Sequence, residues 1–428
     1  MHPSLLALLR CPFCGSALLL QEVLPVLRDG DAVLSAVLGC ACCAYPVVAG
    51  IPVIIAGDRE RAVMNAIEAG RHDDALALML ELEGPRRDAF HALVAKGTGA
   101  TYRDAIGVLS PDAEGTYFVY RLSDPTFVTA SGVLRALAQT RHALSGWTVD
   151  VCGGSGHLTR LLASLRGAGA GSGARSSSGG TIIADVYFWK LWLATRMTAP
   201  GTHAVCCDAN DPLPFVRGFA SLVMLSDAFP YIWRRRALAE ELIRLVDARG
   251  TLLLPHLHSA RGENFSAGMT LQPAGYADIF APLAPRLYPD SALLDGLVAG
   301  ATVDLTHPRA PEAFGDEPSL TLVASRAPEV FARFAVPAPT AVAGALAVNP
   351  LYAAKRTAAG TRLTLTFPTP EYEAEFGACR RYLPDALEVA ADLTAPLDPT
   401  ALRASLGGEV YDDLRRRLVL IDAPPGYC

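Results

Sequence analysis

Residues 147–162 read WTVDVCGGSGHLTRLL and contain the three parts of a ligand-binding turn. The first five residues have the apolar and β-branched character of a short buried strand. Residues 152–156 form a glycine-rich turn, and the rest continues as a helix. Small residues between a strand and a helix let backbone amides approach a ligand closely at the helix N-terminus. This stretch therefore predicts a ligand-binding loop in an α/β fold.

A second strand is expected at residues 181–184 and ends in Asp185, 35 residues after Asp150. Nucleoside-binding α/β folds carry an acidic residue about 20 residues further along the chain than the first strand and its glycine-rich turn, where it accepts hydrogen bonds from ribose hydroxyls. The excess is explained by residues 167–180, GAGAGSGARSSSGG, which have the composition of a flexible loop. Without those 14 residues the spacing is 21. The insertion is therefore expected in a surface loop, with the core spacing preserved.

Strands that end in polar residues recur further along the chain. The next strands are expected at 204–207, 221–225 and 251–254, with a helix at 235–246 and a last strand at 320–325. Alternating strands and helices, with polar residues at the strand ends, predict a doubly wound, mostly parallel Rossmann-like sheet. The ligand is expected at the point where the strand order reverses.

This order resembles the class I S-adenosylmethionine-dependent methyltransferases over residues 115–330. The glycine loop, the acids after the second and third strands, and Ser226-Asp227-Ala228-Phe229 carry the resemblance. It implies S-adenosylmethionine as cofactor, with the glycines lining its methionine end, Asp185 at the ribose and Asp208 near the adenine. Cys152 departs from the family, which usually has glycine there. The residues expected around the cofactor are Asp150, Cys152, Gly153, Gly154, Gly156, Asp185, Asp208, Ala209 and Ser226.

Methyl transfer needs alignment of donor and nucleophile and, for some acceptors, a base. Two residues apart on an extended segment, His256 and His258 are expected on one side, where both face the pocket. A neutral imidazole is a good proton acceptor near pH 7. A metal ion at the two histidines also stays open, although the sequence offers no nearby third ligand of convincing spacing. The catalytic candidates are His256, His258, Asp227 and Tyr231.

Five of the ten cysteines lie within the first 43 residues. Two CxxC pairs separated by 25 residues have the spacing of a zinc ribbon, whose two tight turns offer four thiolates to one ion. Five cysteines compete for four places, and the CxxC spacing favours Cys43 over Cys42. The ligands expected for a structural zinc ion are Cys11, Cys14, Cys40 and Cys43.

Residues 1–57 also resemble a small zinc-ribbon family whose members include activator subunits of RNA and protein methyltransferases. The resemblance lies in the Leu-rich start, the CPxC turn and the stretch Tyr-Pro-Val-x-x-Gly-Ile-Pro-Val. Residues 58–114 are expected to form a helical linker region. Residues 331–428 form a C-terminal region of unknown role, which either completes the substrate pocket or forms a homodimer interface. The aromatic, basic and acidic side chains of residues 117–125 suit either a lid over the pocket or an inter-domain packing segment.

Composition limits the location and the substrate. No apolar run reaches transmembrane length, and no secretory signal is convincing. Clustered cysteines then predict metal binding in a reducing cytoplasm. The formal charge of −6, from 37 Lys and Arg against 43 Asp and Glu, argues against a nucleic-acid substrate.

The expected function is methyl transfer to an oxygen or nitrogen nucleophile of a small molecule or biosynthetic intermediate. Bacterial rRNA methyltransferases that join a zinc module to the same fold supply the second interpretation, a base methyltransferase acting on rRNA or tRNA. A third is a cofactor-binding scaffold that docks a partner through the zinc ribbon. Use of the sulfonium for a non-methyl transfer or a cyclisation also stays open.

Overall fold

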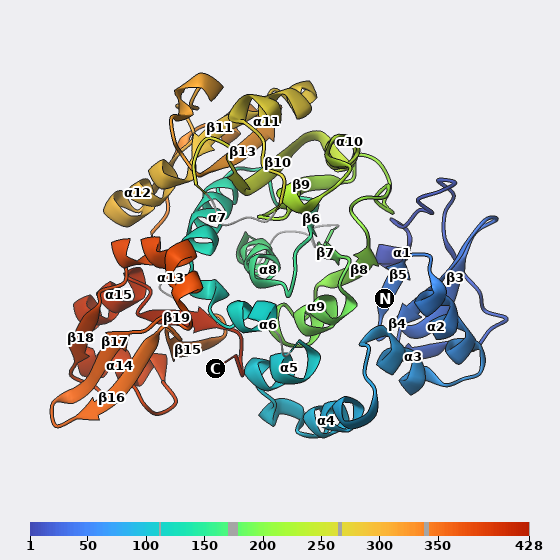
Figure 1. Cartoon of the computed structure of the whole chain (residues 1–428), viewed down its shortest axis with the longest axis horizontal. Coiled ribbons are helices and arrows are strands. Elements are labelled where there is room, and N and C mark those ends of the chain that lie inside the picture. The colour runs from blue at the N-terminus through green and yellow to red at the C-terminus, as the bar shows by residue number, and fades with distance from the viewer. Residues whose placement is uncertain (111–112, 170–178, 264–267, 338–341, 428) are drawn as a thin grey trace.

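One twelve-stranded sheet runs through most of the molecule (Figure 1). Its strands follow the order β1-β3-β4-β5-β8-β7-β6-β9-β10-β13-β11, and β2 pairs with β3 beside this path. The computed structural model describes residues 1–110, 113–169, 179–263, 268–337 and 342–427. The Gly/Ala/Ser-rich insertion expected at 167–180 falls largely on residues 170–178, outside the described residues.

Five parallel strands form the centre of the sheet. In β6, Val149 pairs with Ile182 of β7 on one side and with Val223 of β9 on the other. The strands are apolar and almost entirely buried, as parallel strands covered by helices on both faces should be. The expected doubly wound, mostly parallel fold is confirmed. The bounds are β6 (Trp147–Val151), β7 (Thr181–Asp185), β8 (His203–Cys207), β9 (Ala220–Leu225) and β10 (Val246–His258).

The far edge of the sheet is antiparallel. β13 (Ser319–Ser325) lies between β10 and β11 (Arg286–Pro289) and runs antiparallel to both. From β6 the chain passes to β7 and β8 on one side and then returns to β9 on the other. Such a reversal opens a crevice at the carboxyl ends of the two adjacent strands, where ligands of α/β sheets bind.

Helices cover both faces, and alternate strand residues contact them. Leu222 and Met224 of β9 belong to the core beneath α7 and α8, whereas Val223 belongs to the core beneath α10. Helix α7 begins sharply because the Asp124 carboxylate accepts a hydrogen bond from the Phe127 amide at 2.6 Å. The helices of this part are α7 (Pro125–Leu137), α8 (His157–Gly169), α9 (Phe188–Leu193), α10 (Arg235–Leu245), α11 (Pro273–Ile279) and α12 (Asp290–Gly300).

The N-terminal segment extends the same sheet. Strand β5 (Ile51–Ile54) pairs in parallel with β8, so that Val53 lies opposite Cys206. Leu9 and Tyr45 are fully buried in the core that also contains Phe215. The cysteine-bearing segment and the central sheet therefore share one hydrophobic core. Its elements are α1 (Pro3–Leu6), β1 (Leu19–Leu20), β2 (Leu27–Asp29), β3 (Ala32–Gly39) and β4 (Ala44–Val48).

Five helices connect this segment to α7. They pack mainly on the face of the sheet that also contacts α9, through a core containing Val63, Tyr102 and Leu191. Among the described residues, no helix combines the length and apolar character needed to cross a membrane. The helices are α2 (Asp58–Glu68), α3 (His72–Met79), α4 (Gly84–Ala95), α5 (Tyr102–Leu109) and α6 (Ala113–Phe118).

The C-terminal region forms small sheets of its own, drawn in orange and red in Figure 1. Its core includes Leu363, Tyr372 and Leu420, and partly buried Tyr117 and Tyr120 from the middle of the chain pack against it. This contact brings α13 beside the central domain. The elements are β12 (Thr302–Asp304) with β14 (Arg333–Ala335), β15 (Ala345–Val348) with β19 (Leu420–Ala423), β16 (Tyr352–Thr357), β17 (Gly360–Leu365), β18 (Ala386–Val389), α13 (Pro370–Phe376), α14 (Pro399–Leu406) and α15 (Gly408–Arg416).

Candidate active site

A cavity of about 610 Å³ lies at the carboxyl ends of β6, β7, β8 and β9. Its volume and its position at the reversal of strand order are those of a small-molecule site. The structure brings together most of the residues singled out in the sequence. Those lining the cavity are Asp150, Cys152, Gly153, Gly154, Asp185, Asp208, Ala209, Ser226, Asp227 and Tyr231.

The glycine loop is packed so closely at Gly153 that no side chain fits there. A Cβ on Gly153 would lie 2.7 Å from Ile183 Cγ1 and 2.9 Å from Asp150 Cγ. Cys152 adopts φ +55°, a left-handed conformation that is unfavourable for a residue with a side chain. Cys152 therefore keeps a backbone conformation that favours glycine, and this retains local strain in the loop.

Asp185 fastens the loop to the end of β7. Its carboxylate accepts hydrogen bonds from the Gly154 amide and from the Tyr187 amide, both at 2.9 Å. Each carboxylate oxygen can accept a second hydrogen bond. Asp185 also lines the cavity beside the loop.

Asp150 lies below the loop and is almost completely buried. Its pKa is raised to about 7, mainly by burial; the hydrogen bond from the Thr159 hydroxyl at 2.6 Å opposes this rise and the charge of Asp185 adds to it. Gly156 does not line the cavity. Its φ is +86°, and a Cβ there would lie 2.9 Å from Ala194 Cβ, so this glycine allows the loop to pack against the end of α9.

The opposite end of the cavity includes Asp227, which follows β9 and pairs with a histidine at the end of β10. His258 Nε2 lies 3.0 Å from Asp227 Oδ1, and His256 Nδ1 lies 2.9 Å from Asp290 Oδ2. The pairing of β10 with β13 shifts register between Leu254 and Leu257, at a bulge that contains His256. The two imidazoles meet edge to face, with their centroids 4.9 Å apart.

The expectation that both histidines face the pocket needs correction. Neither is among the residues that line the cavity, whereas Asp227 is. The side chain of His258 is only 7% exposed and lies behind Asp227, and that of His256 is 19% exposed. The bulge breaks the alternation on which the expectation rested, because His256 adopts φ +56°.

Charges in this cluster shift the pKa values of its members. Burial alone would raise the pKa of Asp227, but the hydrogen bond from His258 and the charges of His256 and Arg121 hold it below its ordinary value. Burial alone would lower the pKa of His256, but the hydrogen bond to Asp290 raises it above its usual range. Asp227 is therefore ionised at neutral pH.

Several residues of the cavity wall were not singled out as site residues. Tyr117, Phe118, Arg121 and Asp124 form one side of the cavity. Since Tyr117 and Tyr120 also pack against the C-terminal core, the segment both lines the cavity and packs between two parts of the chain. Tyr372, Glu375 and Phe376 of α13 form another, although nearly 150 residues separate them from Asp227. No motif marks α13, so only the fold brings it to the site.

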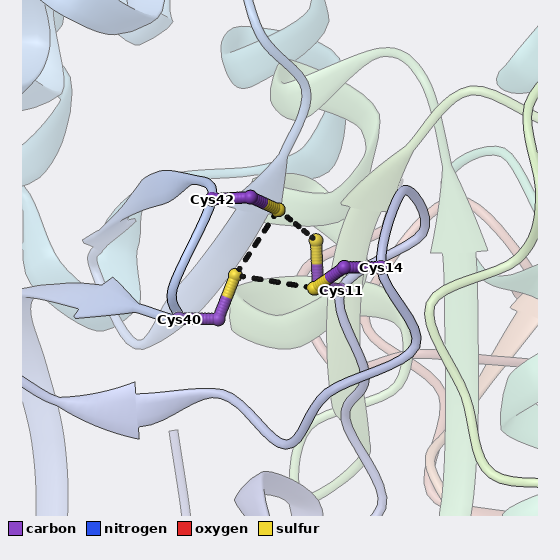
Figure 2. Close-up of side chains that lie close together, drawn as sticks. All are labelled: Cys11, Cys14, Cys40 and Cys42. Atoms are coloured by element: carbon purple, nitrogen blue, oxygen red, sulfur yellow. Dashed lines mark hydrogen bonds between the residues drawn. The ribbon is translucent and has the colours of Figure 1, made fainter.

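Four cysteine sulfurs converge in the N-terminal segment (Figure 2). Cys11 and Cys42 lie 3.6 Å apart, Cys14 and Cys40 3.7 Å, and Cys40 and Cys42 3.6 Å. In a tetrahedral zinc site with bonds of about 2.3 Å, neighbouring sulfurs are about 3.8 Å apart, so the cluster fits this ion. Burial would raise the pKa of Cys11, but the Tyr45 hydroxyl holds it lower, at about 6, which favours the thiolate that zinc binds.

The choice of Cys43 as the fourth ligand is wrong. Cys40 and Cys43 face each other across the turn between β3 and β4, where the Cys40 amide donates to the Cys43 carbonyl at 2.9 Å. Cys42 lies within that turn and its sulfur points to the cluster (Figure 2). The Cys43 sulfur contacts Cys42 at 3.4 Å but does not belong to the group of four.

Comparison with known proteins gives structural neighbours only. No family model matches the chain, and no curated protein matches its sequence. Similar structures include a methyltransferase dependent on S-adenosylmethionine from Aquifex aeolicus, at 14% identity, over 49% of this chain and 96% of that one, with a TM-score of 0.33. A chain from the complex between the Trm112 methyltransferase activator of Haloferax volcanii and a methyltransferase matches at 17% identity. The match covers 45% of this chain and 87% of that one, with a TM-score of 0.30.

An N-methyltransferase from Haemonchus contortus, in complex with phosphomonomethylethanolamine and S-adenosylhomocysteine, is another neighbour. It matches at 12% identity, over 53% of this chain and 60% of that one, with a TM-score of 0.35. These neighbours are methyltransferases or include a methyltransferase activator, and each resembles only about half of this chain.

Proposed function

We propose that this protein transfers a methyl group from S-adenosylmethionine to an oxygen or nitrogen atom of a small molecule or biosynthetic intermediate. The sulfonium supplies an activated methyl group, and the acceptor loses a proton as the new bond forms. The observation that carries the proposal is one continuous cavity joining the glycine loop and Asp185 to Asp227. The cofactor and acceptor ends would thus share one continuous cavity, which would align donor and acceptor as methyl transfer requires.

The roles of the individual residues belong to the proposal. The Gly153–Gly154 backbone would lie against the methionine end of the cofactor, Asp185 would accept the ribose hydroxyls and Asp208 with Ala209 would lie near the adenine. Asp227, Tyr231, His256 and His258 would orient the acceptor and ease the loss of its proton, with Asp227 and Tyr231 in contact with it. A zinc ion held by Cys11, Cys14, Cys40 and Cys42 would be structural.

The cytoplasm is the proposed compartment, since thiolate ligands require reduced cysteines. A small acceptor is favoured over RNA because the cavity is about 610 Å³ and two of its walls come from α6 and α13. A nucleic-acid base would have to be taken out of its stack to enter such a site.

Calorimetric titration with S-adenosylhomocysteine tests the cofactor assignment. Hydrogen bonds to a charged group contribute about 1.5–3 kcal/mol, so Asp185→Ala should weaken binding by roughly 10-fold to 100-fold. Asp278→Ala provides the control, because Asp278 is exposed on α11 and does not line the cavity. Equal affinity of the Asp185→Ala protein and the wild type would exclude this site for the cofactor.

A further inference from the structure

We infer that Asp227, His256 and His258 bind a divalent ion of the first transition series at the acceptor end of the cavity. One ligand atom from each of the three side chains lies within 4.8 Å of the others. Within the described residues, the other group that meets this condition is the cysteine cluster. Two imidazoles and one carboxylate form the ligand set of many zinc and iron sites that keep positions open for a substrate.

The backbone that presents these ligands is unusual. Asp227 has φ +62° and His256 has φ +56°, and both carry side chains in a region that favours glycine. The Asp227 amide donates to the Pro255 carbonyl at 3.3 Å, which ties the two strand ends together. Strained conformations of this kind persist where the surrounding structure enforces them, and they cluster at functional sites. Here they bring the carboxylate of one strand end to the imidazoles of the next.

An outer set of hydrogen bonds supports His256. The Thr321 hydroxyl donates to Asp290 Oδ1 at 2.7 Å, and Asp290 Oδ2 holds His256 Nδ1 at 2.9 Å. The carboxylate accepts a hydrogen bond from Nδ1, which keeps the ring proton on that nitrogen and leaves Nε2 as the ligand atom. Asp290 is itself buried and follows β11, so the arrangement is anchored in the sheet.

His258 is almost buried beside Asp227. Its side chain is 7% exposed, and Nδ1 is buried without a hydrogen-bond partner among the described residues. A buried polar atom without a partner is rare and accompanies functional sites or a bound ion or water. Nε2 lies 3.0 Å from Asp227 Oδ1, which brings an imidazole nitrogen and a carboxylate oxygen to the same point.

The guanidinium of Arg121 is paired mainly with residues other than Asp227, so it does not neutralise the proposed metal site. Arg121 lies 3.8 Å from Asp227 Oδ2, but its closer partners are Asp124 at 3.0 Å and Thr126 at 2.6 Å. Asp227 Oδ1 is directed to His258 instead. The carboxylates of Asp290 and Glu375 add further negative charge on this side, so a divalent cation is electrostatically favoured.

The role of this metal site depends on the proposed function, because Asp227 lines the part of the cavity where the acceptor would lie. An acceptor hydroxyl bound at an open position of the ion would have a lowered pKa and a fixed place beside the methyl donor. The inference thus favours a hydroxyl-bearing acceptor over an amine, since an amine already carries a nucleophilic lone pair when unprotonated.

Metal titration of the full chain tests the inference. Protein with its cysteine cluster loaded with zinc would be titrated with Co²⁺, followed by its visible absorption and by metal content after gel filtration. The wild type should bind one further equivalent with nitrogen and oxygen ligands, without the charge-transfer band of a cobalt thiolate. Asp227→Asn and His256→Gln should lose this equivalent, and Asp290→Asn should bind it roughly 10-fold to 100-fold more weakly.

His142→Gln is the matched control, since His142 also pairs with an aspartate, Asp247, at 2.9 Å but belongs to no such group. It should bind cobalt like the wild type. A wild type that takes up no second equivalent, or an Asp227→Asn protein that still takes it up, would overturn the inference. Binding of S-adenosylhomocysteine to the same samples is measured in parallel, so a failed metal site is distinguished from a failed cofactor site.

Discussion

At the scale of single residues, the N-terminal cluster distinguishes between two adjacent cysteines. Cys42 and Cys43 are neighbours in sequence and their sulfurs lie 3.4 Å apart, yet it is the Cys42 sulfur that belongs to the group of four. Spacing alone selects Cys43, because CxxC is the more frequent knuckle pattern. The backbone hydrogen bond between Cys40 and Cys43 closes the turn instead and directs Cys42 to the other three sulfurs.

This difference gives a sharp prediction. Cys42→Ser should no longer bind zinc at the cysteine cluster, because a hydroxyl is a poor replacement for a thiolate ligand. The zinc bound by thiolates is measured by its release with a mercurial thiol reagent. Cys43→Ser should retain one such zinc per chain. The two variants differ by one position and carry the same chemical change, so each controls for the other. Zinc retained by Cys42→Ser and lost by Cys43→Ser would restore Cys43 as the ligand.

At the scale of elements, the glycine loop depends on how closely β6 and β7 approach it. Gly153→Ala would push a methyl group into Ile183 and Asp150, at 2.7 and 2.9 Å, and should destabilise the protein by about 1–3 kcal/mol. Binding of S-adenosylhomocysteine should weaken at least tenfold, because the loop must move. Urea unfolding and calorimetry measure the two effects.

Gly167→Ala in the adjoining helix α8 is the matched control. Nothing lies within 4 Å of a Cβ at this exposed position, so alanine should stabilise the helix by about 0.5–1 kcal/mol and leave binding unchanged. If Gly153→Ala behaved like Gly167→Ala, the close approach at the loop would not constrain the site.

The strands and helices also differ in how well the sequence predicts them. Strands β6 to β9 and the residues at their ends were predictable because apolar runs bounded by polar residues report burial directly. The bulge in β10 and the contribution of α13 were not, because both depend on contacts between distant segments. Asp290 and Glu375 carry no local signal, and they reach the site only through the pairing of β11 and the packing of α13.

At the scale of the whole molecule, the zinc cluster and the central sheet should unfold together. Strand β5 continues the sheet through β8, and Leu9 and Tyr45 are buried in the core of the central sheet. The Cys11→Ser, Cys14→Ser double variant should therefore lower the melting temperature of the entire chain, by roughly 5 °C or more, in a single transition.

Tryptophan fluorescence is suited to this measurement. All four tryptophans lie between residues 147 and 233, outside the cysteine-bearing segment, so their emission reports on the central domain alone. Circular dichroism follows the whole chain. Fluorescence melting that is unchanged in the double variant, while circular dichroism shows an earlier transition, would mean that the two parts unfold independently.

The contribution of α13 to the cavity also has a consequence for the order in which the site is made during synthesis. The loop at 152–156 and the strands β6 to β9 leave the ribosome well before Tyr372, Glu375 and Phe376 of α13. Segments that are synthesised first generally fold first. A nascent chain would thus complete the side of the cavity formed by the glycine loop while the side lined by α13 was still open to water, and the proposed reaction would begin only after α13 had docked.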